Sequence, residues 1–288
     1  DLAALADGFA AIHIGQAAGT HAITIGNAVF QDPLLVRTPA GGSVNVSGAL
    51  TTTENITFNA GGAVQGSGSV TAPRVTFVAG GIGSLAMPLQ LDTPDLDVQN
   101  SAGNALIANA GSVNLLNNFR NTASGGELRL IANNGAIDTG AVAVQSAGGR
   151  IALIANDATG GATGNIVVGA GGIVSTGGDI ALHAADNITI NGAIAAGAGN
   201  VRMLAGTGPG INAAHASFTG TNPPVPTELA PDDFGFITFN APASAASMVL
   251  VSSTSATPTV VNMITQTAAG AIATTGALDR KSTRLNSS

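Results

Sequence analysis

The sequence has no cysteine, no tryptophan and no tyrosine, and its 288 residues include 9 Phe. Without cysteine the chain can form neither disulfide bonds nor metal sites with thiolate ligands. The scarcity of aromatic residues excludes the wide aromatic core of many globular domains. Charged residues make up 9% of the chain and hydrophobic residues 45%. This balance argues against charge-driven disorder and indicates small aliphatic side chains stacked in a narrow core.

Basic residues are also scarce, and the formal net charge is -7. An acidic chain has no electrostatic attraction to nucleic acid or to an anionic membrane surface. No apolar run approaches the length needed to span a bilayer. The composition therefore predicts that the chain neither binds nucleic acid nor inserts into a membrane.

An eight-residue phrase recurs in the central part of the sequence: GGELRLIA, GGRIALIA, GGDIALHA and AGNVRMLA, which start at Gly125, Gly148, Gly177 and Ala198. The fourth and sixth residues of each phrase are apolar, and residues two apart lie on the same face of a strand. The phrase therefore predicts a strand with one apolar face.

The same register, extended toward the N-terminus, gives five earlier copies that start at Gly41, Thr53, Ala72, Thr93 and Ala110. Across the nine copies the third residue is always polar: Ser43, Asn55, Arg74, Asp95, Ser112, Glu127, Arg150, Asp179 and Asn200. The third residue did not determine the register, so its polarity is an independent check on the repeat.

Successive copies start 12 to 29 residues apart. These spacings are close to the length of one coil of a solenoid. The sequence predicts an all-β fold, a right-handed parallel β-helix of about 20-residue coils, with roughly 13 coils in a rod roughly 60 Å long. An antiparallel sandwich is the alternative. It would favour short hairpin turns and has no reason to repeat one phrase in register.

Four segments are predicted along the chain. Residues 1–220 form β-helix coils, and residues 221–233 form a proline-rich loop or hinge because proline cannot donate a hydrogen bond to a central ladder. Residues 234–278 continue the coils. Residues 279–288, DRKSTRLNSS, break the composition and resemble a translated sequencing adapter, so we expect no strand in register there. The native protein is then expected to be longer at both ends.

Several stretches resemble the repeats of filamentous-haemagglutinin-like large exoproteins of Gram-negative bacteria: ADGFAAIHIG, DPLLVRTPAGGSVNVSGALTT, VTFVAGGIGSLAMPLQLDTPDLDV and GDIALHAADNITINGAI. The likeness covers most of residues 1–278 and lies in the texture of the repeat. It implies a β-helical passenger exported by a two-partner or autotransporter route, which acts as an adhesin or a toxin stalk.

One group of side chains is the best candidate for catalysis. Asp92, Asp95 and Asp97 fall close together, and Arg74 is expected one coil before Asp95. Parallel β-helix enzymes that degrade pectin gather acidic and basic residues on an outer strand face in this way. The favoured interpretation is a solvated surface with an Arg74–Asp95 pair, which contributes roughly 0.2–1 kcal/mol.

The four histidines, His13, His21, His183 and His215, lack the spacing of metal ligands and are expected at the surface. We therefore predict no catalytic, cofactor-binding or metal-binding residue. The predicted function is a structural, adhesive stalk of a secreted or surface-exposed adhesin. Its expected partners are an outer-membrane export pore and host-cell or surface receptors. A polysaccharide-degrading β-helix is the alternative.

Overall fold

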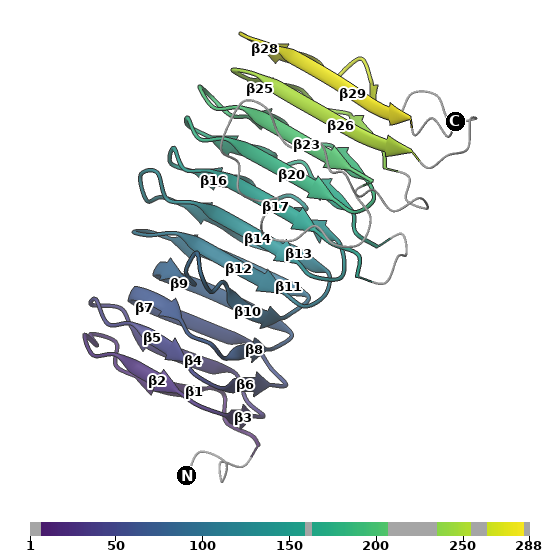
Figure 1. Ribbon diagram of the computed structural model, residues 1–288. Coiled ribbons are helices and arrows are strands. Elements are labelled where there is room, and N and C mark those ends of the chain that lie inside the picture. The colour runs from purple at the N-terminus through teal and green to yellow at the C-terminus, as the bar shows by residue number, and fades with distance from the viewer. Residues whose placement is uncertain (1–6, 159–162, 207–234, 255–263, 285–288) are drawn as a thin grey trace.

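The computed structural model describes residues 7–158, 163–206, 235–254 and 264–284. These residues contain 29 strands and no helix. The strands pair in parallel and form a β-solenoid of about 9 turns, in which successive turns are about 22 residues apart in the sequence. The coils are stacked from the N-terminus to the C-terminus along one axis (Figure 1). The predicted parallel β-helix is confirmed. The predicted number of coils is too high, because the coils are longer than expected and residues 207–234 and 255–263 lie outside the described residues.

Three ladders of strands run along the solenoid. The first contains β1 (Ile12–Gly15), β4 (Leu34–Thr38), β7 (Ile56–Gln65), β9 (Arg74–Ile82), β11 (Asp95–Asn100) and β13 (Val113–Asn121). Beyond β13 it divides into two columns. One contains β15 (Ile137–Asp138), β18 (Ile166–Val168), β21 (Ile188–Ile190), β24 (Ile237–Phe239) and β27 (Ile264–Gln266). The other contains β16 (Val144–Ser146), β19 (Ile173–Ser175), β22 (Ile194–Ala195), β25 (Ala243–Ala245) and β28 (Ile272–Thr274).

The second ladder begins with β2 (Ile23–Ile25) and β5 (Val44–Val46) and passes through the ends of β7 and β9. It continues through β12 (Ala105–Asn109), β14 (Leu128–Ala132), β17 (Ile151–Ala155), β20 (Ile180–Ala184), β23 (Val201–Ala205), β26 (Met248–Thr254) and β29 (Leu278–Arg284). The third contains β3 (Ala28–Phe30), β6 (Ala49–Thr52), β8 (Ser69–Thr71) and β10 (Leu89–Asp92), and it joins the second at β12.

Nine copies in one register predict nine strands stacked on one another in parallel, and the structure corrects this prediction, because the copies do not form one stack. The four central copies, β14, β17, β20 and β23, pair directly with one another in the second ladder. The copies in β7, β9, β11 and β13 belong to the first ladder, whereas β5 belongs to the second. Alternating polar and apolar residues mark any strand whose inner face is buried, whichever side of the coil it forms. Successive copies that start closest together in the sequence therefore lie in different ladders, on different sides of the coil.

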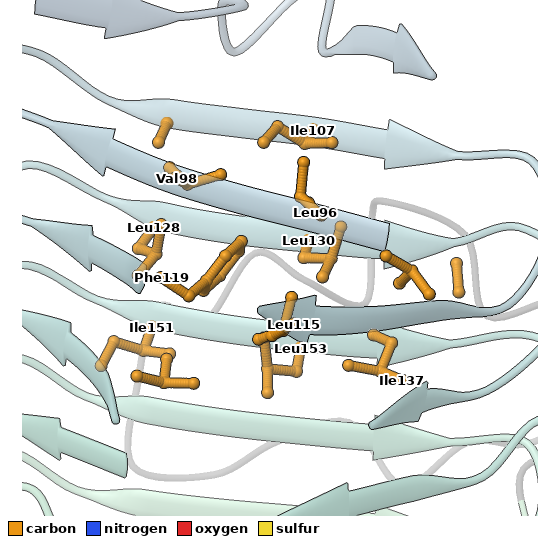
Figure 2. Packing of buried hydrophobic residues seen from close by; sticks show 14 of the residues in the cluster. Leu96, Val98, Ile107, Leu115, Phe119, Leu128, Leu130, Ile137, Ile151 and Leu153 are labelled. Carbon is orange, nitrogen blue, oxygen red and sulfur yellow. The ribbon is translucent and has the colours of Figure 1, made fainter. Parts of the chain in front are cut away.

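Inward side chains from opposite ladders meet in one continuous core. Leu153 pairs with Leu130 of the preceding coil and Leu182 of the following coil, as predicted, and all three are fully buried. Figure 2 shows Leu130 and Leu153 of the second ladder facing the core with Leu115 of the first. Phe58 and Phe77 stack with their ring centroids 5.3 Å apart. The column needs only small aliphatic residues and a few phenylalanines because the coil is narrow.

In the phrases that start at Gly125 and Gly148, the two opening glycines have different roles. Gly125 and Gly148 have φ angles of 70° and 84°, which residues with a side chain rarely adopt. The second glycine packs against the coil before it, and a Cβ atom on Gly149 would collide with the carbonyl oxygen of Gly126. The paired glycines thus turn the corner and let consecutive coils approach each other.

The outward positions of β14, β17, β20 and β23 are buried as well as the inward ones. Ala108, Ile131 and Ile154 form a second apolar cluster on this outer face. The alternation of the phrase predicted solvent there. The apolar residues at these positions were the signal for burial on both faces, since strands buried on both sides lose the polar half of the alternation.

The expectation of no strand in residues 279–288 is wrong for their first part. β29 pairs with β26 in register, with Leu278 opposite Met248 and Arg280 opposite Leu250. Backbone hydrogen bonds hold an edge strand without regard to side chains, and the exposed Arg280 guanidinium donates to the Gln266 Oε1 atom at 3.1 Å. The adapter hypothesis itself stays a prediction about the DNA. The predicted proline-rich loop, 221–233, lies outside the described residues.

Candidate functional site

Arg74 and the carboxylates of β11 meet on the outer face of the first ladder. Arg74 pairs in register with Asp95, as predicted. Its guanidinium, however, donates to the Oδ2 atom of Asp97 at 3.3 Å, and the Asp97 side chain is only 6% exposed. The side chain of Asn117 donates to the same oxygen at 3.1 Å. The ion pair is therefore formed with Asp97, a buried partner, and not with the predicted Asp95.

Asp95 and Asp92 do not take part in that ion pair. Asp95 is half-buried, and its Oδ1 atom accepts a hydrogen bond from the Asn114 side chain at 3.3 Å. Asp92 is exposed at the end of β10. Within the described ranges, no hydrogen bond or ion pair joins it to Arg74, Asp95 or Asp97. The predicted group is thus split into an ion pair between Arg74 and the buried Asp97 and two separate surface carboxylates.

A surface hollow of about 480 Å³ lies beside this group, where the first ladder divides. The pairing of β11 with β13 is irregular between Leu96 and Val98, which leaves Leu116 and Asn117 in an extra stretch of β13. The lining residues are Asp95, Asn114, Leu115, Leu116, Asn117, Asp138, Gly140, Ala141 and Val142. The corner between β15 and β16 thus closes one side of the hollow.

The polar side chains that line the hollow bind other groups of the chain. The Asn114 and Asn117 amides donate to Asp95 and Asp97, and the Asp138 Oδ1 atom accepts the Gly140 N–H at 2.8 Å. Two carboxylates line the hollow, and no lysine or arginine is among its lining residues. Such a surface repels a polyanion such as polygalacturonate, because its carboxylates would face carboxylates without a cation between them.

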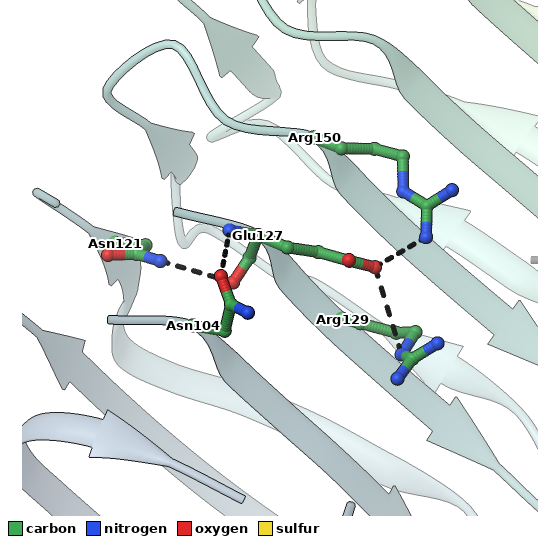
Figure 3. A network of polar contacts seen from close by, with 5 residues as sticks. All are labelled: Asn104, Asn121, Glu127, Arg129 and Arg150. Carbon is green, nitrogen blue, oxygen red and sulfur yellow. Dashed lines mark hydrogen bonds and ion pairs between the residues drawn. The ribbon is translucent and has the colours of Figure 1, made fainter. Parts of the chain in front are cut away.

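A second polar network joins three coils of the second ladder near its outer face (Figure 3). The Glu127 Oε1 atom lies 2.6 Å from Arg150 Nη2 and 3.8 Å from Arg129 Nε. The Glu127 N–H donates to Asn104 Oδ1 at 2.9 Å. The polar third residues of the phrase predict an Arg150 that faces water between Glu127 and Asp179 of the neighbouring coils. Its side chain is instead 19% exposed and bound to Glu127.

Burial is the main influence on the pKa of Arg129 and Arg202, two arginines of this face. It lowers the pKa of Arg129, the Glu127 carboxylate opposes that shift, and the Arg150 charge adds to it. Burial also lowers the pKa of Arg202 to about 10. With a pKa of about 10, Arg202 remains a cation near neutral pH. Arg129 and Arg202 occupy outward positions of β14 and β23, so both side chains lie on the covered face and not in an open groove.

The histidines are only partly where they were expected. His13 and His21 are exposed. The prediction is wrong for His183, which is fully buried at an outward position of β20 between Ile154 and Leu204. His215 lies outside the described residues. Where the structure describes the chain, no three His, Cys, Asp or Glu side chains form a group that could hold a metal ion, and no helix is long and apolar enough to span a membrane.

Buried asparagines form a polar ladder that sequence reasoning missed. The Asn100 side chain donates to Asn121 Oδ1 at 3.0 Å, and Asn121 in turn donates to the carbonyl oxygens of Gly103 and Glu127 at 3.0 and 3.1 Å. Asn109 binds the backbone of Thr93 through both its amide nitrogen and its oxygen. These side chains satisfy backbone groups at corners of the coil, and asparagine at the end of a strand phrase was the available signal.

Comparison with protein-family models, curated proteins and solved structures found no significant match to this chain.

Proposed function

We propose that the chain is a non-enzymatic stalk segment of a secreted or cell-surface adhesin. The observation that carries the proposal is the continuous apolar column, which runs through the coils from β1 to β28. Each coil contacts its neighbours through parallel backbone ladders, so the segment is a rigid spacer. Most polar groups of the candidate site bind other groups of the chain, as expected of a structural element.

The family resemblance and the composition support an exported protein. A chain without cysteine can cross membranes unfolded without forming disulfides on the way. The partners proposed for it are an outer-membrane export pore, engaged by regions outside this sequence, and a receptor on a host cell or other surface. Gram-negative bacteria are the proposed source because the repeat texture resembles their large exoproteins.

A polysaccharide-degrading enzyme is the second candidate, and the carboxylates Asp95 and Asp138 beside the hollow favour it. General acid–base chemistry on a sugar requires carboxyl groups in an open site. Three features weigh against an enzyme of the pectin-degrading kind. Arg74 is bound to Asp97, Asp92 stands apart, and no cation is among the lining residues of the hollow to bind a polyanion.

Three measurements test the proposal. Antibodies against the purified chain should label intact cells of the source bacterium, and the DNA upstream of the segment should encode an export domain in the same frame. The purified chain should leave neutral and acidic polysaccharides uncleaved. Labelling only after permeabilisation would contradict export, and cleavage that is lost in Asp95→Asn and Asp138→Asn would establish the enzyme instead.

A further inference from the structure

The chain contains two Asn-Gly sequences, Asn134–Gly135 and Asn191–Gly192. In such a sequence the glycine nitrogen can attack the side-chain carboxamide carbon of asparagine, because glycine has no side chain to hinder the approach. The attack needs a glycine N–H that is free to leave its surroundings. The hydrogen bonds of the two glycines therefore decide which sequence reacts.

Gly135 is held in place by its backbone. Its N–H donates to the carbonyl oxygen of Asn156 at 2.8 Å, so the nitrogen that would attack is already committed between two coils. The Asn134 carboxamide is exposed, and its Oδ1 atom accepts the Ala158 N–H at 3.1 Å. A reaction at this site requires the bond between Gly135 and Asn156 to break first.

Gly192 differs from Gly135 in the hydrogen bonding of its backbone nitrogen, the atom that would attack. The Asn191 N–H donates to the Val168 carbonyl oxygen at 2.7 Å, but the N–H of Gly192 donates none of the hydrogen bonds found in the described part of the chain. Asn191 is exposed, and its Oδ1 atom accepts a hydrogen bond from the half-buried side chain of Asn240 at 2.9 Å. Both carboxamides thus accept a hydrogen bond, and the difference between the sites lies in the glycine.

We propose that Asn191 is a site of spontaneous deamidation. A bond forms between the Gly192 nitrogen and the Asn191 Cγ atom, the nitrogen loses its proton to water, and the side-chain nitrogen leaves as ammonia. Water then opens the succinimide ring to aspartate or isoaspartate, so water is the only co-reactant. Each conversion adds one negative charge to the corner between β21 and β22.

The two products affect the corner differently. An aspartate at position 191 can still accept the hydrogen bond from Asn240. Isoaspartate adds a backbone methylene where Gly192 already packs against Gly169 and Gly172 so closely that a Cβ atom would collide with the Gly169 carbonyl oxygen. Conversion of Asn191 to isoaspartate should therefore loosen the contact between two coils.

The test uses the purified 288-residue chain, aged at neutral pH in buffer and, in parallel, in concentrated urea. Peptide mass mapping and isoaspartyl methyltransferase labelling measure conversion at positions 134 and 191. In the folded chain Asn191 should convert roughly tenfold faster than Asn134, equivalent to ~1.4 kcal/mol. In urea, where neither glycine is held, the two rates should converge. Asn191→Gln should abolish the signal at 191 and leave the signal at 134 unchanged.

Two results would overturn the proposal. One is equal conversion of Asn134 and Asn191 in the folded chain. The other is an Asn191 that stays intact in the folded chain although it converts in urea, which would show that the fold protects both glycines.

Discussion

Single inward residues determine whether neighbouring coils stay together, and Leu153 is the clearest case. Leu153→Asp would place a carboxylate between Leu130 and Leu182 with no partner. The free energy of unfolding should fall by more than about 4 kcal/mol. Urea unfolding followed by circular dichroism measures the loss.

Val174→Asp is the matched control, because Val174 lies at an outward position of β19 and is 38% exposed. Its cost should be at most about 1 kcal/mol. Equal losses in the two variants would mean that the inward column is not the core.

The buried asparagine ladder allows a second test at the scale of one residue. Asn121 accepts hydrogen bonds from the Ala123 N–H and the Asn100 side chain and donates to two carbonyl oxygens. Asn121→Ala leaves several buried polar groups without partners and should cost about 2–3 kcal/mol. Asn114→Ala removes one exposed bond to Asp95 and should cost about 0.5 kcal/mol or less. Thermal melts of both variants compare the two losses of stability. A larger loss in Asn114→Ala than in Asn121→Ala would contradict the role given to the buried asparagines.

The glycine pair of the strand phrase is tested at the scale of the element. Gly149→Ala brings a Cβ atom against the Gly126 carbonyl oxygen and should cost about 2 kcal/mol. In the next copy, a Cβ atom on Gly177 would meet open space, and the φ angle of Gly177 is not positive. Gly177→Ala should therefore be neutral or stabilising by up to about 1 kcal/mol. Chemical denaturation curves should separate the two variants, and a Gly149→Ala protein as stable as wild type would contradict the close approach of the coils.

The elements show how far the sequence can predict this fold. The phrase predicted strands, their inward residues and their parallel pairing, because burial of alternate residues leaves a direct mark on composition. It could not assign strands to ladders, since an inward-facing strand has the same pattern on every side of a coil. The apolar Ile131 at an outward position was a signal for burial on both faces, but the burial of the polar His183 depends on what covers the face, which a strand pattern does not encode. The Arg74–Asp97 pair depends on side-chain directions within a shared register.

At the scale of the whole molecule, a solenoid gains stability from contacts between neighbouring coils. The described coils at each end have a neighbour on one side only, and their inward residues are partly buried, as at Ile12, Ile23, Ile264 and Ile272. Native-state amide exchange should be slowest in β14, β17 and β20 and faster in β1 and β27. Uniform protection along the chain would indicate one cooperative unit instead of stacked coils.

The central claim is that consecutive coils pair in parallel and in register, and two spin labels test it most directly. Gln145 and Val174 are register partners in β16 and β19, and both side chains are exposed. The chain has no cysteine, so Gln145→Cys and Val174→Cys introduce the only labelling sites. With backbones about 4.8 Å apart, the doubly labelled protein should show strong dipolar broadening in its continuous-wave spectrum. A spectrum equal to the sum of the two singly labelled proteins would contradict the stacked solenoid.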